Sequence, residues 1–331
     1  MIDYIFSKSK LGLAPMSEIN NKIFRQICKY MGAYPVFTGM ISSDAITRNH
    51  ANSFQLAEFD DYERPLGVQL FGYSFETVSK AGQIINERLK PDFIDFNSGC
   101  PVRKVVKKNS GAALLKDLKT LNLILKKLHE AVKPTPVTVK IRSGWSRVNL
   151  KEIIRAVEDS GIEAIILHPR LAVQGYEGNA SYDLLKEAVS STDLPIIASG
   201  DIDSFEKAVF IMNSTSCFSV LVGREARSNP FIFTNPYVLP DDKDRISVAL
   251  LYLLRSFLAS GEKAFWSSKP YCAAFTKGIS HGAELRRNIF QSSSFYELYN
   301  VLHDKWERLD ESSYPEIVFL VTELKKKASL L

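Results

Sequence analysis

The sequence predicts an α/β protein in which eight βα units form a closed parallel barrel, followed by a small all-helical domain. Three observations support this fold class. Short apolar or β-branched runs alternate with amphipathic stretches over the first two thirds of the chain. Runs of this kind stop near residue 240, where helical patterning takes over. With 331 residues, of which 45% are hydrophobic, the chain can fill a sizeable core.

Eight runs are typical of strands, because each is short, apolar and bounded by turn residues or by a helical stretch. They cover residues 11–16, 35–38, 67–71, 93–97, 137–141, 164–168, 196–199 and 220–223. Helices are expected between them, several opened by a capping residue, at residues 21–31, 74–89, 117–132, 150–160, 182–189 and 204–212. Eight such units in about 220 residues match the size of a (β/α)8 or TIM barrel.

The C-terminal region has a different character. After Asn235-Pro236 and the turn-rich segment 239–242, a helix is expected at residues 246–258. The last helix is expected to open at Pro315, since proline suits a first helical turn, and lysines 325–327 near its end complement the helix dipole. We therefore expect a barrel domain over residues 1–238 and a helical domain over residues 239–331.

The composition excludes several classes of protein. Charged residues make up 24% of the chain, which is ordinary for a folded domain, and the net charge of +5 permits a polyanionic partner without requiring one. The four cysteines form no Cys-x-x-Cys pair, so neither a disulfide framework nor a metal site is expected. No signal peptide and no run approaching the roughly 18 apolar residues of a membrane span are visible. A cytoplasmic protein without membrane association is expected.

In a barrel of this kind, the functional site is built from the C-terminal ends of the strands. One polar strand end carries little information, because every strand must exit to solvent. Here seven of the eight predicted strand ends are polar. The set comprises Pro15, Met16 and Ser17; Gln69; Asn97 leading to Cys100; Lys140; His168 with Arg170; Ser199, Gly200 and Asp201; and Gly223 with Arg224.

The last two strand ends indicate a phosphate site. Glycines in the Ser199-Gly200-Asp201 and Gly223-Arg224 segments let backbone N–H groups approach phosphate oxygens, and Arg224 can add a bidentate contact. Lys140 is aimed into the barrel mouth by strand alternation, where a lone lysine is unfavourable unless it meets an anion. The pyrimidine side of a reduced flavin supplies one, and Gln69 could hydrogen-bond the same ring edge.

Cys100 lies in the most specific segment, Asn97-Ser98-Gly99-Cys100-Pro101. Gly99 and Pro101 enforce a rigid turn that would hold the thiol over the barrel mouth, although a free cysteine is most often simply buried. No histidine base is adjacent, so a proton-donating thiol suits the pattern better than a thiolate nucleophile. The basic residues that follow, among them Arg103 and Lys104, indicate an anionic macromolecular substrate if this is the active site.

These residues resemble those of the tRNA-dihydrouridine synthases, and the resemblance covers nearly the whole chain. The stretch Asn97-Ser98-Gly99-Cys100-Pro101-Val102-Arg103-Lys104 is highly specific, and further matching segments occur in order at residues 13–16, 67–72, 95–104, 111–115, 140–145, 174–180 and 199–202. Three places depart from the family pattern: Glu18 and Pro169 stand where glycine is usual, and residues 224–230 are less glycine-rich. At these three places the resemblance does not predict the geometry of the loops.

The resemblance implies an FMN-containing barrel and a helical domain that together grip tRNA, with NADPH or NADH as the source of electrons. Reduced flavin would reduce C6 of a uracil, and Cys100 would give a proton to C5. Asn97 would contact the uracil with Arg170 close by, Arg103 and Lys104 would contact the RNA, and a monomer is expected. The FMN positions would be Pro15, Met16, Ser17, Gln69, Lys140, His168, Ser199, Gly200, Asp201, Gly223 and Arg224.

Two other functions remain open from the sequence. An FMN barrel acting on a free small molecule, such as a dihydroorotate dehydrogenase or an ene-reductase, would share the phosphate site and the lysine. It would not explain the basic residues after Cys100 or the helical appendage. A non-catalytic RNA-binding protein on a barrel scaffold is the second, and bound flavin would argue against it.

Overall fold

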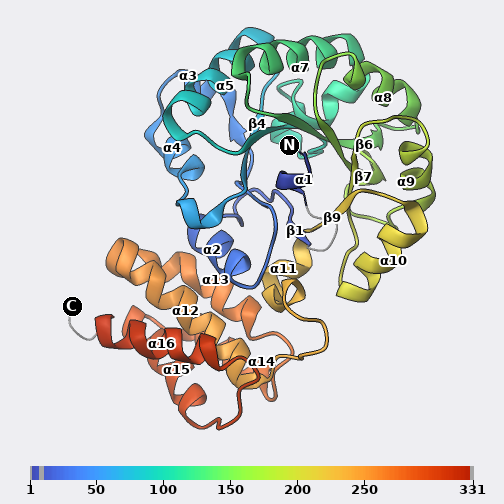
Figure 1. Ribbon diagram of the computed structural model, residues 1–331. Helices are drawn as coiled ribbons and strands as arrows, with labels where there is room; N and C mark the ends of the chain where they lie inside the picture. The colour runs from blue at the N-terminus through green and yellow to red at the C-terminus, as the bar shows by residue number, and fades with distance from the viewer. Residues whose placement is uncertain (1, 7–10, 329–331) are drawn as a thin grey trace. The chain divides into compact units, whose positions relative to one another are not determined.

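The computed structural model describes residues 2–6 and 11–328, which form two compact units, Met1–Gly223 and Arg224–Leu331. The first unit is a nearly closed parallel barrel with helices on its outside (Figure 1). The predicted fold class is confirmed. The change in sequence character near residue 239 falls at the start of a long helix, and the predicted domain boundary there stays a prediction.

All eight predicted strands are present. They are β1 (Gly12–Leu13), β2 (Val36–Phe37), β4 (Leu66–Phe71), β5 (Phe93–Ser98), β6 (Val137–Gly144), β7 (Ala164–Leu171), β8 (Ile196–Ser199) and β9 (Ser219–Val222). Strand β3 (Ile41–Ser42), which was not predicted, pairs with β4. The order is β1-β9-β8-β7-β6-β5-β4-β2, and the Leu13 N–H donates to the Pro35 carbonyl at 2.8 Å across the remaining gap.

The predicted barrel helices are also present, as α2 (Lys22–Tyr30), α5 (Phe75–Leu89), α7 (Leu118–Val132), α8 (Leu150–Glu158), α9 (Tyr182–Val189) and α10 (Phe205–Thr215). Asn21, Ser74, Asp117 and Ser204 each accept a backbone N–H at the start of their helix, as N-capping residues do. The sequence did not indicate four short helices: α1 (Ile2–Ile5) precedes β1, and the other three lie in the loops, at α3 (Ser43–Thr47), α4 (Ala51–Ala57) and α6 (Arg103–Val106).

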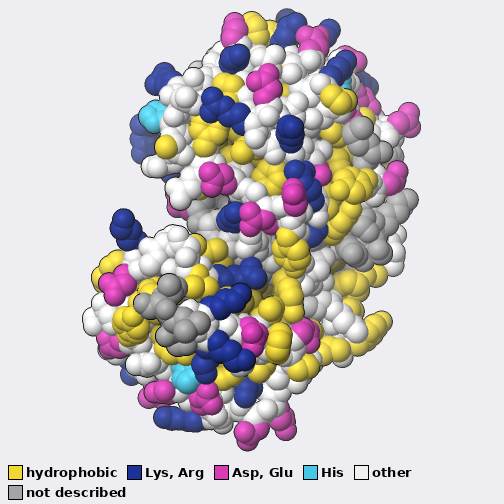
Figure 2. All heavy atoms as spheres, turned by 60° about the vertical axis from the view of Figure 1, so that its left-hand side comes forward, with side chains coloured by type: hydrophobic (Ala, Val, Ile, Leu, Met, Phe, Trp, Pro, Cys, Tyr) yellow, Lys and Arg dark blue, Asp and Glu magenta, His cyan; other side chains and the backbone are white. Residues whose placement is uncertain are grey.

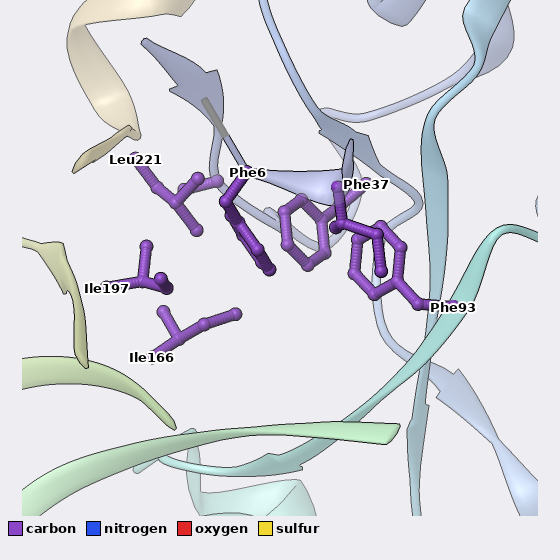
Figure 3. Packing of buried hydrophobic residues seen from close by; sticks show 8 residues of the cluster. Phe6, Phe37, Phe93, Ile166, Ile197 and Leu221 are labelled. Atoms are coloured by element: carbon purple, nitrogen blue, oxygen red, sulfur yellow. The ribbon is translucent and has the colours of Figure 1, made fainter. Parts of the chain in front are cut away.

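The lower part of the barrel interior is filled by apolar side chains from several strands. Phe37, Phe93, Ile166, Ile197 and Leu221 point toward one another, and Phe6, just after α1, packs among them (Figure 3). Gly67 makes room for this layer, since a Cβ there would lie 2.3 Å from the Phe93 ring. The barrel interior is therefore closed by a packed apolar core, and polar groups gather at the C-terminal ends of the strands.

The second unit is all-helical. It contains α11 (Arg224–Ser228), α12 (Asp242–Ser260), α13 (Phe265–Phe275), α14 (Gly282–Gln291), α15 (Phe295–Glu307) and α16 (Pro315–Ala328), and α16 begins at the predicted proline. Helix α12 is buried on most of its surface because α13, α15 and α16 pack around it. Basic and hydrophobic side chains both reach the surface of this unit (Figure 2). None of the helices in residues 2–6 and 11–328 is long and apolar enough to span a membrane.

Candidate functional site

The site is built on strands β4, β5 and β6, whose register places polar side chains side by side. Gln69 pairs with Asp95 and Asp95 with Thr138, so these three residues form one layer across the strands. Two residues further along, Asn97 pairs with Lys140. Because side chains alternate between the two faces of a strand, both pairs face the same side of the sheet. The predicted site residues Gln69, Asn97 and Lys140 are thereby brought together.

A chain of hydrogen bonds links this layer to the Cys100 turn. The Cys100 N–H donates to Asn97 Oδ1 at 3.0 Å, and Asn97 Nδ2 donates to Gln69 Oε1 at 2.9 Å. Gln69 Nε2 then donates to Asp95 Oδ2 at 2.6 Å, and Thr138 Oγ1 donates to Asp95 Oδ1 at 2.6 Å. A backbone N–H can only donate, so it fixes the orientation of both amides. This series of hydrogen bonds must therefore end on an acceptor at position 95.

Asp95 was not among the predicted site residues. Its side chain is fully buried, and desolvation raises its pKa to about 7, while the hydrogen bonds from Gln69 and Thr138 and the charge of Lys140 act in the opposite direction. A charged residue inside the apolar run 93–97 was the available signal. Alternation also puts it on the same face as Asn97, so the sequence could have indicated its role.

Lys140 is the half-buried cation of the site. Burial and the nearby Arg142 charge lower the pKa of its ammonium group to about 8, and Asp95 and Cys100 act in the opposite direction. Its Nζ forms no hydrogen bond or ion pair with any residue in the part of the chain that the structure describes. A cation in this position is stabilised by an anionic ligand. The residues present therefore fit the negatively charged ring edge of a reduced flavin.

Cys100 is half-buried on the turn after β5. Burial raises the pKa of its thiol above the ordinary value, although Arg142, Lys140 and Lys104 each favour the thiolate. The loop that follows packs closely against it: Ala112 N–H donates to the Cys100 carbonyl at 3.0 Å. Gly111 has φ +61°, and a Cβ at that position would lie 2.7 Å from the same carbonyl oxygen. The backbone of the turn is therefore held in place, and burial favours the neutral form of the thiol.

Arg142, which the sequence did not single out, joins the loops around the turn. Its Nε donates to the Gly99 carbonyl at 2.9 Å, and its Nη1 donates to the carbonyls of Leu171 and Gly175 at 2.9 and 2.7 Å. The side chain is buried, and its guanidinium lies over the Tyr176 ring at 5.7 Å. This arginine connects the Cys100 turn to the loop after β7. Only tertiary contacts show this, because its three acceptors are far from it in sequence.

Arg170 has a similar connecting role on the other side of the mouth. Nη1 and Nη2 make a bidentate ion pair with Asp201 at 2.9 and 2.6 Å, Nη2 also donates to Gly178 O, and Nε donates to Glu177 O. The remaining N–H points at His168 Nε2 at 3.1 Å. Arginine has five N–H donors, so all are engaged with protein groups. Its expected closeness to the substrate stays a prediction.

The same contacts define His168 and Asp201. Since an arginine N–H can only donate, His168 Nε2 is the acceptor and the neutral ring carries its proton on Nδ1. The Asp201 carboxylate also accepts the Ala180 N–H at 2.8 Å. The Asp201 carboxylate is thus already bound by Arg170 and by the loop after β7. Only the backbone of the segment 199–201 is then left to contact a phosphate.

The predicted phosphate segments lie at the ends of β8 and β9. Ser199 is buried at the end of β8, and Gly200 has φ +116° with space for no side chain, because a Cβ would lie 2.6 Å from the His168 ring. Gly223 follows β9 and has only ordinary contacts within reach of a Cβ. Arg224 opens α11 and belongs to the helical unit. The phosphate roles of these residues stay predictions.

The loop after β1 contains Pro15, Met16 and Ser17, of which the first two are half-buried and Ser17 is exposed. Glu18 has φ +64°. The loop therefore keeps a left-handed backbone without glycine, at a cost of roughly 1 kcal/mol. Asn20 anchors the loop through bonds of 2.9 Å from its Nδ2 to the carbonyls of Ala14 and Phe37.

Arg103 and Lys104 lie on α6, directly after the Cys100 turn, and both are exposed. Lys104 forms a surface ion pair with Glu18 at 3.4 Å, which is weak because both groups are well solvated. Their predicted contact with RNA stays a prediction. Among the described residues, no cluster of three or more His, Cys, Asp or Glu side chains could hold a metal ion.

Comparisons with known proteins identify the family. The family model described as dihydrouridine synthase (Dus) matches residues 12–294. The chain belongs to this family. A probable tRNA-dihydrouridine synthase of Aquifex aeolicus is 33% identical over 92% of this chain and 98% of its own length. A probable tRNA-dihydrouridine synthase of Treponema pallidum is 30% identical over 90% of this chain and 93% of its own.

A solved structure gives the same fold. The old yellow enzyme from Trypanosoma cruzi superposes with a TM-score of 0.50 at 10% identity, covering 67% of this chain and 86% of that one. At this identity the likeness concerns the fold. The family assignment confirms the sequence-based prediction that the chain is a flavin-dependent oxidoreductase.

Proposed function

We propose that this protein is a tRNA-dihydrouridine synthase that binds FMN and reduces the C5–C6 double bond of a uridine in tRNA with electrons from NADPH or NADH. The observation that carries the proposal is the series of hydrogen bonds from Asp95 to the Cys100 turn, beside Lys140, whose Nζ has no hydrogen-bond or ion-pair partner among the described residues. It places one thiol, whose neutral form burial favours, on the turn after β5 and one half-buried cation on the neighbouring strand β6. These are the two groups that a flavin-dependent uracil reduction requires.

In the proposed reaction, this chain's residues act on the uracil and on the cofactor's ring edge. When bound, FMN would supply the two electrons that reduce the uracil. Cys100 Sγ–H gives its proton to C5, and burial favours the neutral thiol needed for this step. Solvent then returns a proton to the thiolate. Lys140 would face the pyrimidine side of the flavin, and Gln69 would face the same edge.

The remaining residues support binding and placement in this proposal. Asn97 would hold the uracil through its amide, of which one hydrogen is engaged by Gln69. The target base must leave the stack to reach the barrel mouth. Pro15, Met16, Ser17, His168, Ser199, Gly200, Asp201, Gly223 and Arg224 would surround FMN, while Arg103 and Lys104 would contact the RNA. The domain over residues 239–331 would add tRNA affinity, in a monomer working in the cytoplasm.

The proposal is tested by measuring dihydrouridine in individual tRNAs from cells with and without the gene. Loss of dihydrouridine at a defined position, restored by the intact gene, is the expected result. An unchanged set of dihydrouridines together with reduction of free uridine or orotate by the purified protein would favour a small-molecule reductase instead.

Cys100→Ala tests the proton-donor role. The variant should retain FMN but reduce tRNA uridine more slowly by orders of magnitude, because only the proton donor is removed. Cys217→Ala is the matched control: this cysteine is also in the barrel unit, but it is buried outside the site. Wild-type turnover of Cys100→Ala would exclude the assigned role.

A further inference from the structure

Asp95 and Lys140 are a buried carboxyl group and a half-buried cation that no ion pair joins. The two oxygens of Asp95 accept from uncharged groups, the Thr138 hydroxyl and the Gln69 amide, both at 2.6 Å. Lys140 lies two residues beyond Thr138 on β6, roughly 7 Å along the strand, and faces the same side of the sheet. Its charge acts on Asp95 through space. Each group therefore favours the charged form of the other without contact.

The hydrogen bonds around Asp95 suit both of its protonation states. Gln69 Nε2 can only donate, so Asp95 Oδ2 is an acceptor in either state. The Thr138 hydroxyl can donate or accept, so it donates to Oδ1 of the carboxylate and can accept from Oδ1–H of the acid. A proton on Oδ1 therefore leaves Asp95 with both of its hydrogen-bond partners.

The balance between the two states of Asp95 depends on what faces Lys140. Desolvation raises the pKa of Asp95 to about 7, and its hydrogen bonds and the charge of Lys140 act in the opposite direction. An anion placed against Lys140 would cancel the effect of the lysine and would itself repel the carboxylate, so the acid form would be favoured at neutral pH. In the proposed function this anion is the ring edge of the reduced flavin, which carries a negative charge that the oxidised ring lacks.

We propose that Asp95 takes up a proton from solvent when the bound flavin is reduced and releases it when the flavin is reoxidised. This inference rests on the function proposed above. The hydride from the nicotinamide adds a proton and an electron pair to the flavin and leaves a negative charge there, and the solvent proton on Asp95 Oδ1 compensates that charge. When the hydride passes to the uracil, the negative charge leaves the flavin, and Asp95 returns its proton to solvent. The net charge of Asp95, Lys140 and the flavin together is then the same in both oxidation states.

The test compares three FMN-loaded full-length proteins: wild type, Asp95→Asn and Glu163→Gln. Asparagine at position 95 imitates the acid, because its amide can accept from Gln69 and donate to Thr138. Glu163 is the matched control, since burial also raises the pKa of its carboxyl group. It precedes the first residue of β7, at the opposite end of the strands from the site, and its bond from the Val137 N–H at 2.7 Å can be kept by glutamine.

Two measurements follow the proton in each protein. The infrared spectrum is recorded before and after electrochemical reduction of the flavin, in water and in heavy water, and the difference shows any carboxyl group that becomes an acid. A pH indicator in weakly buffered solution counts the solvent protons taken up when one equivalent of NADPH reduces the flavin. Neither measurement depends on turnover of tRNA.

At about pH 7.5, reduction should produce a carboxylic-acid C=O band that shifts in heavy water, in wild type and in Glu163→Gln but not in Asp95→Asn. Wild type should take up about half a proton or more per flavin, because most of Asp95 is ionised at that pH before reduction. Near pH 5 the band should be absent from all three proteins, since Asp95 is then already protonated with the oxidised flavin.

Two results would overturn the proposal. Proton uptake by wild type without a carboxylic-acid band would place the proton on Lys140 or on the flavin ring. The same band in Asp95→Asn would place it on another carboxyl group. The proposed function is tested separately: a protein that shows the Asp95 band but forms no dihydrouridine in tRNA would refute that function alone, and one that forms dihydrouridine without the band would refute only the role of Asp95.

Discussion

Replacing Asp95 is the sharpest test of the hydrogen-bonded chain beneath Cys100. In Asp95→Leu, the side chain keeps a similar size but accepts no hydrogen bond, so Gln69 Nε2 and Thr138 Oγ1 lose their acceptor. Both lie in the buried interior, where each unsatisfied group costs about 1–3 kcal/mol. Near pH 4, where the raised pKa of Asp95 has not yet removed its stability contribution, the free energy of unfolding should fall by about 4 kcal/mol, within the stability of most domains.

The same variant should slow catalysis. Without its acceptor at position 95, Gln69 no longer orients Asn97, and the Asn97 carbonyl oxygen no longer fixes the Cys100 N–H. A displacement of the thiol by about 1 Å lowers the rate of the proton-transfer step by roughly a hundredfold. Flavin reduction by NADPH should be unaffected, because it does not use the thiol. The assay is stopped-flow oxidation of the reduced enzyme by tRNA, with unfolding in denaturant as the stability measurement.

Asp95→Asn is the matched control. Its Oδ1 can accept from Gln69 Nε2, and its Nδ2 can donate to Thr138 Oγ1, so the chain of hydrogen bonds keeps its direction. Its rate should lie within a few fold of wild type. A wild-type oxidation rate in Asp95→Leu would refute the reasoning. If Asp95→Asn were as slow as Asp95→Leu, the charge of Asp95 rather than its hydrogen bonding would be responsible.

Three further predictions follow from buried charges. Because the Lys140 pKa is lowered to about 8, FMN affinity of the flavin-free protein should fall as pH rises through 8, and Lys140→Arg should move that fall upward; identical pH profiles would contradict this. Because burial raises the pKa of Asp95 to about 7, its stability contribution is lost as pH rises from about 4 to 7. The free energy of unfolding of Asp95→Asn, measured in denaturant, should therefore rise relative to that of wild type by up to about 4 kcal/mol between pH 4 and 7. A difference between the two proteins that does not change with pH would contradict the raised pKa of Asp95. Glu63→Ala leaves buried Arg25 without its carboxylate partner at 2.7 Å and should lower the free energy of unfolding by about 3–5 kcal/mol; a loss no larger than that of exposed Asp61→Ala would refute it.

Much of the barrel could be predicted because its signals are local. N-capping by Ser74 or Asp117 involves a residue three positions further on, and strand alternation has a period of two. These patterns placed all eight strands and the position of Cys100 after the β5 strand. Short elements such as β3 and α6 were not predicted, because an element of two to four residues is too short to show a periodic pattern.

The sequence by itself determined which chemical groups reach the mouth of the barrel, since alternation within each strand settles which side chains point inward. Tertiary structure alone decided which of them meet. The register between β4, β5 and β6 brings Gln69, Asp95 and Thr138 into one layer, and no residue within a strand specifies its neighbour's register. For the same reason the partners of Arg142 and Arg170 emerge only when segments distant in sequence pack together.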